Sequence, residues 1–351
     1  MNLKIYTVIL IASLFTITDL SAGNPDRQGQ AGASELLMNP WGRSAGLHSM
    51  STSSVMGVEA MRINIAGLSR IRKGEFALGN NRLFEGTGMT LNALGFATKM
   101  GETGAFGIEI ASLDFGKIPV TTVNQPEGTG GNFSPSFFQV GLGYSYTYAN
   151  KISVGMLLRG ISESIPDVSA FGFSIDAGVQ YVSGEKENFK LGISLRNIGS
   201  PMRFGGQGLS VQRANPDAAG GVVYDLTFDS RSADFELPSM LNIGVSYDYY
   251  FGEENFLRVL SNFTSNAFSR DQVGAGAEFS FQNLITLRAA YKIDMGDNDE
   301  GTQNIYTGFS GGVSVEVPFK KGGDNNLGID YGYRATNPFK GTHNFTLRLA
   351  F

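Results

Sequence analysis

GTHNFTLRLAF, residues 341–351, ends the chain and alternates between polar and apolar side chains. Four apolar side chains fall on one face of an extended backbone: Phe345, Leu347, Leu349 and Phe351. The opposite face is mostly polar and carries Asn344, Thr346, Arg348 and Ala350. Because successive side chains of a strand point to opposite faces, this period of two predicts a strand with one apolar face. Such a strand fits a soluble sandwich or the wall of a membrane barrel.

The composition favours the membrane barrel. Charged residues make up 17% of the chain, below the roughly 25% usual in soluble domains. Glycine and phenylalanine are abundant, with 47 and 26 residues. Cysteine is absent, which excludes disulfides, thiolate metal sites and cysteine nucleophiles. The net charge of -5 argues against nucleic acid as a partner, because nucleic acids bind to basic surfaces.

The first 23 residues have the features of a secretory signal peptide. Lys4 supplies a positive charge, residues 5–17 are apolar, and small residues allow cleavage after Ala22 or Gly23. Beyond this stretch the sequence has no apolar run as long as the ~18 residues that a spanning helix needs. We therefore expect three parts: a signal peptide at 1–23, an N-terminal segment at 24–74 and a barrel at 75–351.

The N-terminal segment does not alternate and is rich in glycine, serine and methionine. We expect it to fold as a plug inside the barrel or as a cap across the periplasmic mouth. A disordered leader is the alternative.

From Gly74 onward the period of two recurs, and turn residues divide the chain into about 14 strands, an even number as in single-chain bacterial barrels. The predicted strand centres are Ala77, Ala93, Ile108, Leu142, Val154, Ile175, Ile193, Val245, Val259, Ala277, Leu287, Val313, Ile329 and Leu347. The predicted fold is therefore all-β, a transmembrane antiparallel barrel with an N-terminal plug or cap.

The predicted connections differ in length by parity. Those after even-numbered strands are tight, around residues 102, 150, 184–188, 252–255, 282–283 and 320–325. Three of those after odd-numbered strands are long, at 116–134, 199–236 and 295–304. This sorting is typical of outer-membrane barrels, whose short turns are periplasmic, and it predicts that both termini lie in the periplasm. Phe351 at the chain end also resembles the signal by which bacterial outer-membrane barrels are recognised for insertion.

Two short elements of the N-terminal segment carry a further resemblance, through Arg43, Ala45, Gly46, Asn64, Ala66, Gly67 and Leu68. They are similar to the PorV/PorQ family of outer-membrane proteins, in which Ala-Arg-x-Ala-Gly-Met-Gly precedes Asn-Pro-Ala-Gly-Leu. Leu47 and His48 replace the Met-Gly pair here, and Ile65 replaces the proline. Looser similarity extends to residues 174–181, 191–199 and 237–247.

The resemblance implies a fold similar to the fatty-acid transporter barrels and a role in type IX secretion. Such barrels dock beside a large translocon barrel, bind the C-terminal domains of secreted cargo and deliver them to an attachment complex at the cell surface. The long loops would make these contacts. The first candidate, residues 199–236, offers Pro201, Met202, Phe204, Leu209, Val211, Val222 and Val223 as apolar anchors; residues 116–134 are the second. The alternative is that each loop folds over its own barrel mouth.

The competing hypothesis is uptake of hydrophobic small molecules, as in fatty-acid transporters, which needs an apolar pocket beneath the plug. The polar face of the predicted strands instead carries charges of both signs: Glu109, Arg159, Asp176, Arg196, Asp248, Arg258, Glu278, Arg288, Lys292, Asp294, Glu316 and Arg348. These charges disfavour an apolar tunnel. An open porin is a third hypothesis, which a folded plug would block.

We expect no enzyme, cofactor or metal. Outer-membrane phospholipases pair a histidine with a serine, but neither His48 nor His343 lies in a recognisable motif. An acidic loop, with Asp294, Asp297, Asp299 and Glu300, suits a weak calcium site or a solvated loop. Paired glycines along the strands lack the following helix that phosphate binding needs.

Overall fold

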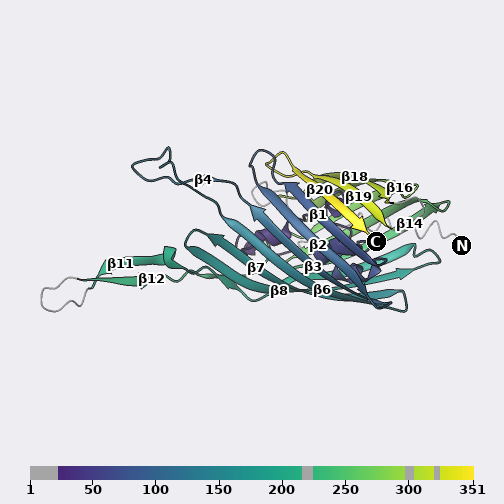
Figure 1. The fold of residues 1–351 in the computed structure, drawn as a ribbon, viewed down its shortest axis with the longest axis horizontal. Coiled ribbons are helices and arrows are strands. Elements are labelled where there is room, and N and C mark those ends of the chain that lie inside the picture. The colour runs from purple at the N-terminus through teal and green to yellow at the C-terminus, as the bar shows by residue number, and fades with distance from the viewer. Residues whose placement is uncertain (1–22, 216–223, 297–303, 320–324) are drawn as a thin grey trace.

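The computed structural model describes residues 23–215, 224–296, 304–319 and 325–351, in which fourteen antiparallel strands close into a barrel (Figure 1). In order around the barrel they are β1 (Gly74–Arg82), β2 (Thr90–Met100), β3 (Gly104–Asp114), β6 (Ser136–Tyr148), β7 (Ile152–Ile165), β8 (Val168–Ser183), β9 (Phe189–Gly199), β14 (Met240–Phe251), β15 (Asn255–Asn266), β16 (Gln272–Phe281), β17 (Ile285–Asp294), β18 (Gly308–Pro318), β19 (Asn326–Arg334) and β20 (Thr342–Ala350). The predicted barrel is confirmed, and every predicted centre lies within one of these strands.

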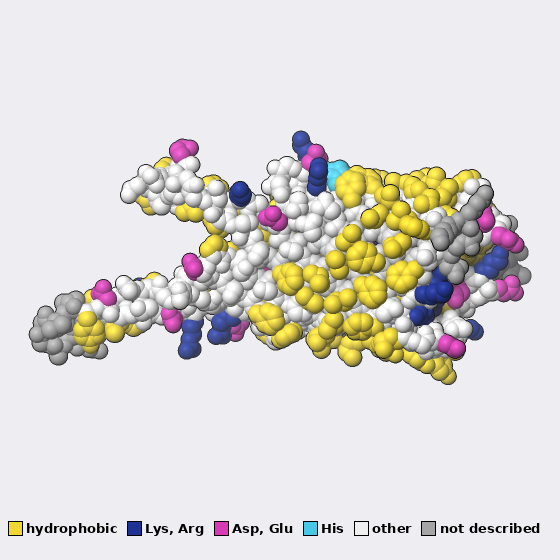
Figure 2. Space-filling model, in the orientation of Figure 1, with side chains coloured by type: hydrophobic (Ala, Val, Ile, Leu, Met, Phe, Trp, Pro, Cys, Tyr) yellow, Lys and Arg dark blue, Asp and Glu magenta, His cyan; other side chains and the backbone are white. Residues whose placement is uncertain are grey.

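The burial pattern of the strands is the reverse of that in a soluble sheet. In β6, Phe138, Tyr144 and Tyr146 are exposed, whereas Gln139 and Ser145 are buried. Figure 2 shows apolar side chains covering much of the outer wall, with charged side chains mainly at the two ends and on the loops. A band of outward-facing apolar side chains over alternating strands is typical of a lipid-facing wall, so the barrel is transmembrane. Among the described residues no helix is both long and apolar enough to cross a bilayer.

The last strand closes the barrel. β20 pairs with β1 from Glu75–Ala350 to Arg82–His343, and with β19 on its other side. The short connections, such as residues 149–151 and 252–254, lie at one end of the barrel, called here the short-turn end. The opposite end, called the long-loop end, carries three small sheets: β4 (Ile118–Pro119) with β5 (Asn132–Phe133), β10 (Met202–Arg203) with β13 (Asp234–Phe235), and β11 (Ser210–Ala214) with β12 (Asp225–Asp229).

One irregularity interrupts the wall between β8 and β9. The register shifts between Ile175 and Ala177, and Asn197 takes a left-handed backbone with φ of 57°. The Asp176 carboxylate accepts a hydrogen bond from the backbone N–H of Asn197 at 2.7 Å, which replaces a missing ladder bond at the bulge.

The N-terminal segment folds inside the barrel as a series of short helices: η1 (Pro25–Arg27), η2 (Ser34–Leu37), α2 (Gly42–Ala45), η3 (Gly57–Glu59), α3 (Ala60–Ile63) and η4 (Ile65–Arg70). One more, η5 (Gln207–Leu209), lies in the loop before β11. Residues 57–69 are buried throughout, so the segment is a plug rather than a cap.

The plug runs through the lumen from end to end. At the long-loop end, the backbone N–H of Asn24 donates to the carbonyl of Ser269 at 3.2 Å. At the short-turn end, Gly74 pairs with Phe351. The prediction that both ends of the mature chain lie on one side is therefore wrong for residue 24, because the plug enters the lumen from the long-loop side. Of the predicted signal peptide, residues 1–22 lie outside the described part of the chain.

Candidate functional site: a plug seated in a divided lumen

Glycines on the lumen face of the wall let the plug lie directly against the strands. A Cβ atom at Gly192 would lie 2.3 Å from the Thr52 carbonyl oxygen, and one at Gly332 would lie 2.4 Å from the Gly42 carbonyl oxygen. Real Cβ contacts essentially never fall below 3.0 Å, so any larger side chain must displace the plug. Other glycines in close contact with it are Gly79, Gly95, Gly107, Gly143, Gly155, Gly178, Gly244, Gly274 and Gly312. We call this set the glycine seat.

The residues that carry the family resemblance belong to the plug side of this seat. Asn64 donates through its amide to the carbonyls of Thr52 at 2.9 Å and Val179 at 3.1 Å. The carbonyl of Ala66 accepts from the hydroxyl of Ser145 at 2.8 Å. A Cβ at Gly67 would lie 2.1 Å from the Val55 carbonyl oxygen. The remaining members also face the wall or its charges: Leu68 against Gly107, Gly46 against Gly312, Ala45 against Gly332, and Arg43 against Glu75.

Alternating charges join β9, β14–β20 and β1 on one half of the lumen wall. Arg258 bridges Asp248 at 2.7 Å and Glu278 at 2.8 Å. Further around the wall, Arg348 pairs with Asp330 at 2.7 Å. We call this set the charge ladder; its members are Lys190, Asp248, Arg258, Glu278, Arg288, Asp330, Arg348, Glu316 and Glu75.

The ladder also ties the plug to the wall. Arg43 of the plug lies 3.0 Å from Glu59 and 3.8 Å from Glu75 of β1. Glu59 in turn accepts a hydrogen bond from the backbone N–H of Ser44 at 3.0 Å. The buried charges therefore hold the plug on this side in addition to the glycine seat.

The other half of the lumen is apolar, which the sequence pattern did not predict. Wall residues of β2, β3, β6 and β7 are fully buried against the plug: Leu91, Leu113, Phe137, Leu157 and Ile161. The plug contributes Leu36, Trp41, Val58, Met61 and Leu68 to the same cluster. Of the charges on this side, Arg159 pairs with Asp176 at 3.0 Å, and Glu109 accepts from the Trp41 indole at 3.1 Å. The expectation that ion pairs and water would fill the lumen, which disfavoured an apolar tunnel, is thus wrong for this half.

Neither histidine forms a hydrogen bond with a serine in the described structure. The Nδ1 atom of His343 lies 2.8 Å from the Tyr331 hydroxyl, and its Nε2 atom lies 3.8 Å from Glu85. His48, in the plug, is buried with both ring nitrogens unpartnered. Burial, together with the charges of Lys292 and Arg334, holds the pKa of His48 well below its usual value, so its imidazole is neutral at pH 7. The geometry gives the phospholipase alternative no support.

The acidic loop does not form a metal site in the part of the chain that is described. The Asp294 carboxylate accepts hydrogen bonds from the Gln272 amide and from the backbone N–H of Asn304, both at 2.7 Å. The other three acids of the expected calcium site, Asp297, Asp299 and Glu300, lie outside the described residues. Elsewhere in those residues, no group of three or more histidine or acidic side chains is placed to hold a metal ion.

The loop at 199–236 divides into a base and an arm. In the base, Met202 is buried in the core, and the Phe204 ring packs against Phe235 with centroids 5.4 Å apart. These two predicted anchors therefore cover the barrel mouth. Pro201 is exposed, Leu209 is half-buried, and Val222 and Val223 lie outside the described residues.

The arm is the β11–β12 hairpin, which projects far from the barrel, as does the loop that carries β4 (Figure 1). Val211 pairs with Phe228 across the hairpin, and both are exposed, as is Leu226 on the same face. In the second candidate loop, Ile118 and Val123 are exposed as well. In the described part of the two loops, the arms therefore carry most of the expected free apolar surface.

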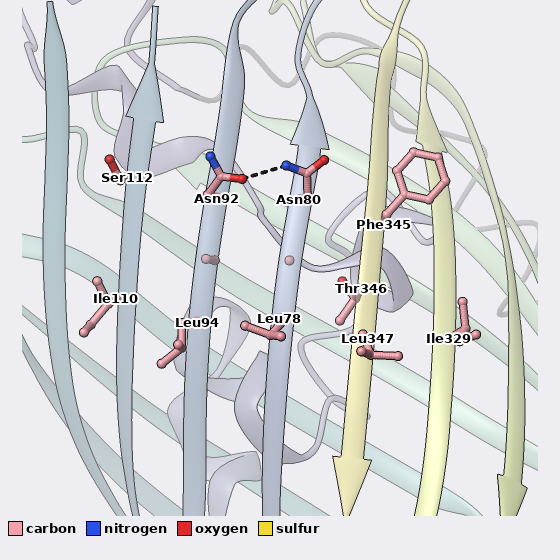
Figure 3. Close-up of a pocket in the computed structure, with 12 residues that line it drawn as sticks. Leu78, Asn80, Asn92, Leu94, Ile110, Ser112, Ile329, Phe345, Thr346 and Leu347 are labelled. Atoms are coloured by element: carbon pink, nitrogen blue, oxygen red, sulfur yellow. Dashed lines mark hydrogen bonds between the residues drawn. The ribbon is translucent and has the colours of Figure 1, made fainter.

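A hollow of about 620 Å³ lies on the outer wall at the seam between β20 and β1 (Figure 3). Outward-facing side chains line it, among them Leu78, Leu94, Ile110, Ile329 and Leu347, and the Asn80 amide donates to Asn92 at 2.7 Å across it. A second hollow of about 480 Å³ lies at the rim near Leu83, Met89 and His343. The seam hollow faces lipid and not the lumen, so it is a surface for membrane lipid rather than a substrate chamber.

No protein-family model and no curated protein matches this sequence. Solved structures do share the fold. The toluene transporter TodX of Pseudomonas putida has 15% identity and a TM-score of 0.54, with 89% of this chain and 97% of TodX covered. The monoaromatic hydrocarbon channel CymD has 14% identity and a TM-score of 0.53, with coverage of 88% and 96%. The toluene transporter TbuX of Ralstonia pickettii has 14% identity and a TM-score of 0.52, with coverage of 87% and 98%.

The likeness extends over nearly the whole length of these barrels, so the chain has the fold of the hydrocarbon-transporter barrels. At such low identity the likeness concerns the fold alone.

Proposed function

We propose that this chain is an outer-membrane barrel that takes up small hydrophobic molecules. The apolar half of the lumen carries the proposal. Its side chains run from Leu83 and Phe84 at the long-loop end to Met61 and Leu68 deep in the plug. The shared fold with proteins described as toluene transporters and a monoaromatic hydrocarbon channel supports it. In an outer membrane the long-loop end faces outward, and export by a cleaved signal peptide stays a prediction.

Uptake by this route requires the plug to move. The wall and plug side chains of the apolar half are packed together with almost no exposed surface, so a molecule can pass only if the plug shifts within the lumen. The proposal therefore makes transport depend on plug motion.

An engineered disulfide tests this dependence cleanly, because the chain has no cysteine of its own. The hydroxyls of Ser53 in the plug and Ser246 in β14 lie 3.0 Å apart, so Ser53→Cys with Ser246→Cys ties the plug to the wall. We expect uptake of radiolabelled toluene and oleate to fall at least about tenfold on oxidation and to return on reduction. The measurement uses cells that lack other hydrocarbon-uptake barrels.

The matched control joins two wall strands without touching the plug. Ser136 and Ser164 face each other across β6 and β7 with their hydroxyls 2.8 Å apart, and the corresponding cysteine pair should leave uptake unchanged in both redox states. Uptake no faster than in cells without the barrel would contradict the proposal, and so would equal uptake by the oxidised and reduced Ser53–Ser246 variant.

A second candidate function, docking of secreted proteins in type IX secretion, is favoured by the projecting arm. On the β11–β12 hairpin, Val211, Leu226 and Phe228 share one face, while Gln212 and Thr227 lie on the other. Exposed apolar side chains on such an arm are typical of a protein-binding surface. The partners in this case are a large translocon barrel, the C-terminal domains of secreted cargo and an attachment complex.

Purification of the tagged protein in a gentle detergent from native outer membranes, followed by mass spectrometry, tests the docking function. We expect a giant translocon barrel, or secreted proteins with a common C-terminal domain, to accompany the unsubstituted protein. The double variant Val211→Ser with Phe228→Ser should lose them, whereas Gln212→Ala with Thr227→Ala should keep them. Recovery of the barrel alone, with fatty acid bound stoichiometrically, would reject docking and favour uptake.

A further inference from the structure

Lys292 and Arg334 lie in the lumen beyond the charge ladder, and among the described residues no acid forms an ion pair with either. Lys292 and Arg334 stand four residues from Arg288 and Asp330 along β17 and β19, toward the long-loop end. Both are at least nine-tenths buried, and neither forms an ion pair with any described residue. Asp294, the acid that acts on Lys292, is already bonded to the Gln272 amide and to the backbone of Asn304.

Several buried hydrogen-bonding atoms around these cations have no partner within the described part of the chain. They are the Nε of Arg334, the hydroxyl of Tyr306 and both ring nitrogens of His48. The Arg334 guanidinium lies 4.1 Å from the centre of the Tyr306 ring. The charges of Lys292 and Arg334 both interact electrostatically with the His48 ring. Because buried polar atoms are nearly always hydrogen-bonded, and the Arg334 Nε, the Tyr306 hydroxyl and one nitrogen of a neutral imidazole are donors, this concentration points to a missing acceptor.

An aromatic lid lies next to the cluster at the long-loop end. The Phe84 ring centre lies 5.0 Å from that of Phe339 and 5.9 Å from that of Tyr306. Leu83 belongs to the same buried apolar cluster as Phe84 and Tyr306. The site is thus cationic on the plug side and apolar on the side of the loops.

We propose that Lys292 and Arg334 bind a compact anion, a carboxylate or a phosphate, with hydrogen bonds from the Tyr306 hydroxyl and the His48 ring. Charge-assisted hydrogen bonds from a guanidinium and an ammonium group match this chemistry. The anion is a free ion or the head group of an amphiphile whose chain lies under the aromatic lid. The site does not depend on the proposed uptake, although an amphiphile would define the class of substrate.

Isothermal titration of the full-length protein in a nonionic detergent tests the site. Sodium acetate, sodium phosphate and sodium decanoate are titrated separately in a buffer free of other small anions. We expect saturable binding of one molecule per barrel, weakened at least tenfold by Lys292→Gln and by Arg334→Gln. Arg334→Lys, which keeps the charge, should retain most of the binding. The exposed Arg203→Gln, in the loop, should change nothing.

The three anions separate the two sources. Tight binding of acetate or phosphate identifies a free-ion site, whereas binding of decanoate alone identifies an amphiphile head group. Absence of saturable binding by the unsubstituted protein for all three would overturn the proposal and leave ordered water as the partner of these atoms. Equal binding by the unsubstituted protein and both glutamine variants would overturn it too. Either result leaves the disulfide test of uptake untouched.

Discussion

Gly192→Ala should unseat the plug and give the barrel an ion conductance that the unsubstituted protein lacks. The added methyl group would lie 2.3 Å from the Thr52 carbonyl oxygen, so the plug backbone must move. That carbonyl also accepts hydrogen bonds from the amides of Asn64 at 2.9 Å and Gln180 at 3.1 Å. The shift therefore also strains these two hydrogen bonds. The loss of stability should then exceed the ~1–3 kcal/mol that is typical of overpacking.

Single-channel recording in planar bilayers measures the leak. Gly141→Ala is the matched control, because Gly141 also faces the lumen but its added methyl group would meet only the Leu157 side chain at 3.5 Å. The control should stay closed. If the Gly192→Ala variant shows no more conductance than the Gly141→Ala variant, close contact with the wall glycines does not hold the plug in place. A conductance of equal size in the unsubstituted protein would show an open lumen, as in the porin hypothesis.

Arg348→Gln should lower the free energy of unfolding by about 3–5 kcal/mol, the cost of leaving buried acids without their partner. Arg348 forms ion pairs with Asp330 at 2.7 Å, with Glu316 at 3.1 Å and with Glu75 at 3.9 Å. Asp330 is fully buried, so water cannot replace the lost guanidinium. The loss should also loosen the plug, since Glu75 is shared with Arg43.

Urea unfolding in lipid vesicles, followed by tryptophan fluorescence, measures this effect, and Trp41 in the plug is the chain's one tryptophan. Arg203→Gln is the control, because its pair with Asp234 lies exposed in the loop and exposed ion pairs contribute little to stability. Adding Asp330→Asn to Arg348→Gln should recover part of the loss. Similar stabilities for Arg348→Gln and Arg203→Gln would show that the ladder does not stabilise the barrel.

The barrel could be predicted from the sequence because its signals are local. The alternation around Leu142 or Leu347 sets the two faces of a strand, and turn residues such as Asn150 mark its end. The parity of loop lengths then indicated which end of the barrel carries the long loops. The plug elements around Arg43 and Asn64 were found by resemblance, but their role in the glycine seat was not.

The alternating sequence by itself determined that the chain forms strands with a lipid face and a lumen face, because the side-chain period of a strand is two whatever its neighbours. Only the tertiary structure decided what each lumen residue touches. Gly141 and Gly192 have the same pattern in sequence, yet only Gly192 lies against the plug. The sequence predicts Met202 as a free loop anchor, but its side chain is buried. Arg348 forms an ion pair with Asp330, whereas no described acid forms one with Arg334. These differences arise from contacts between residues far apart in the chain, which are set by the closure of the barrel around its plug and not by local sequence.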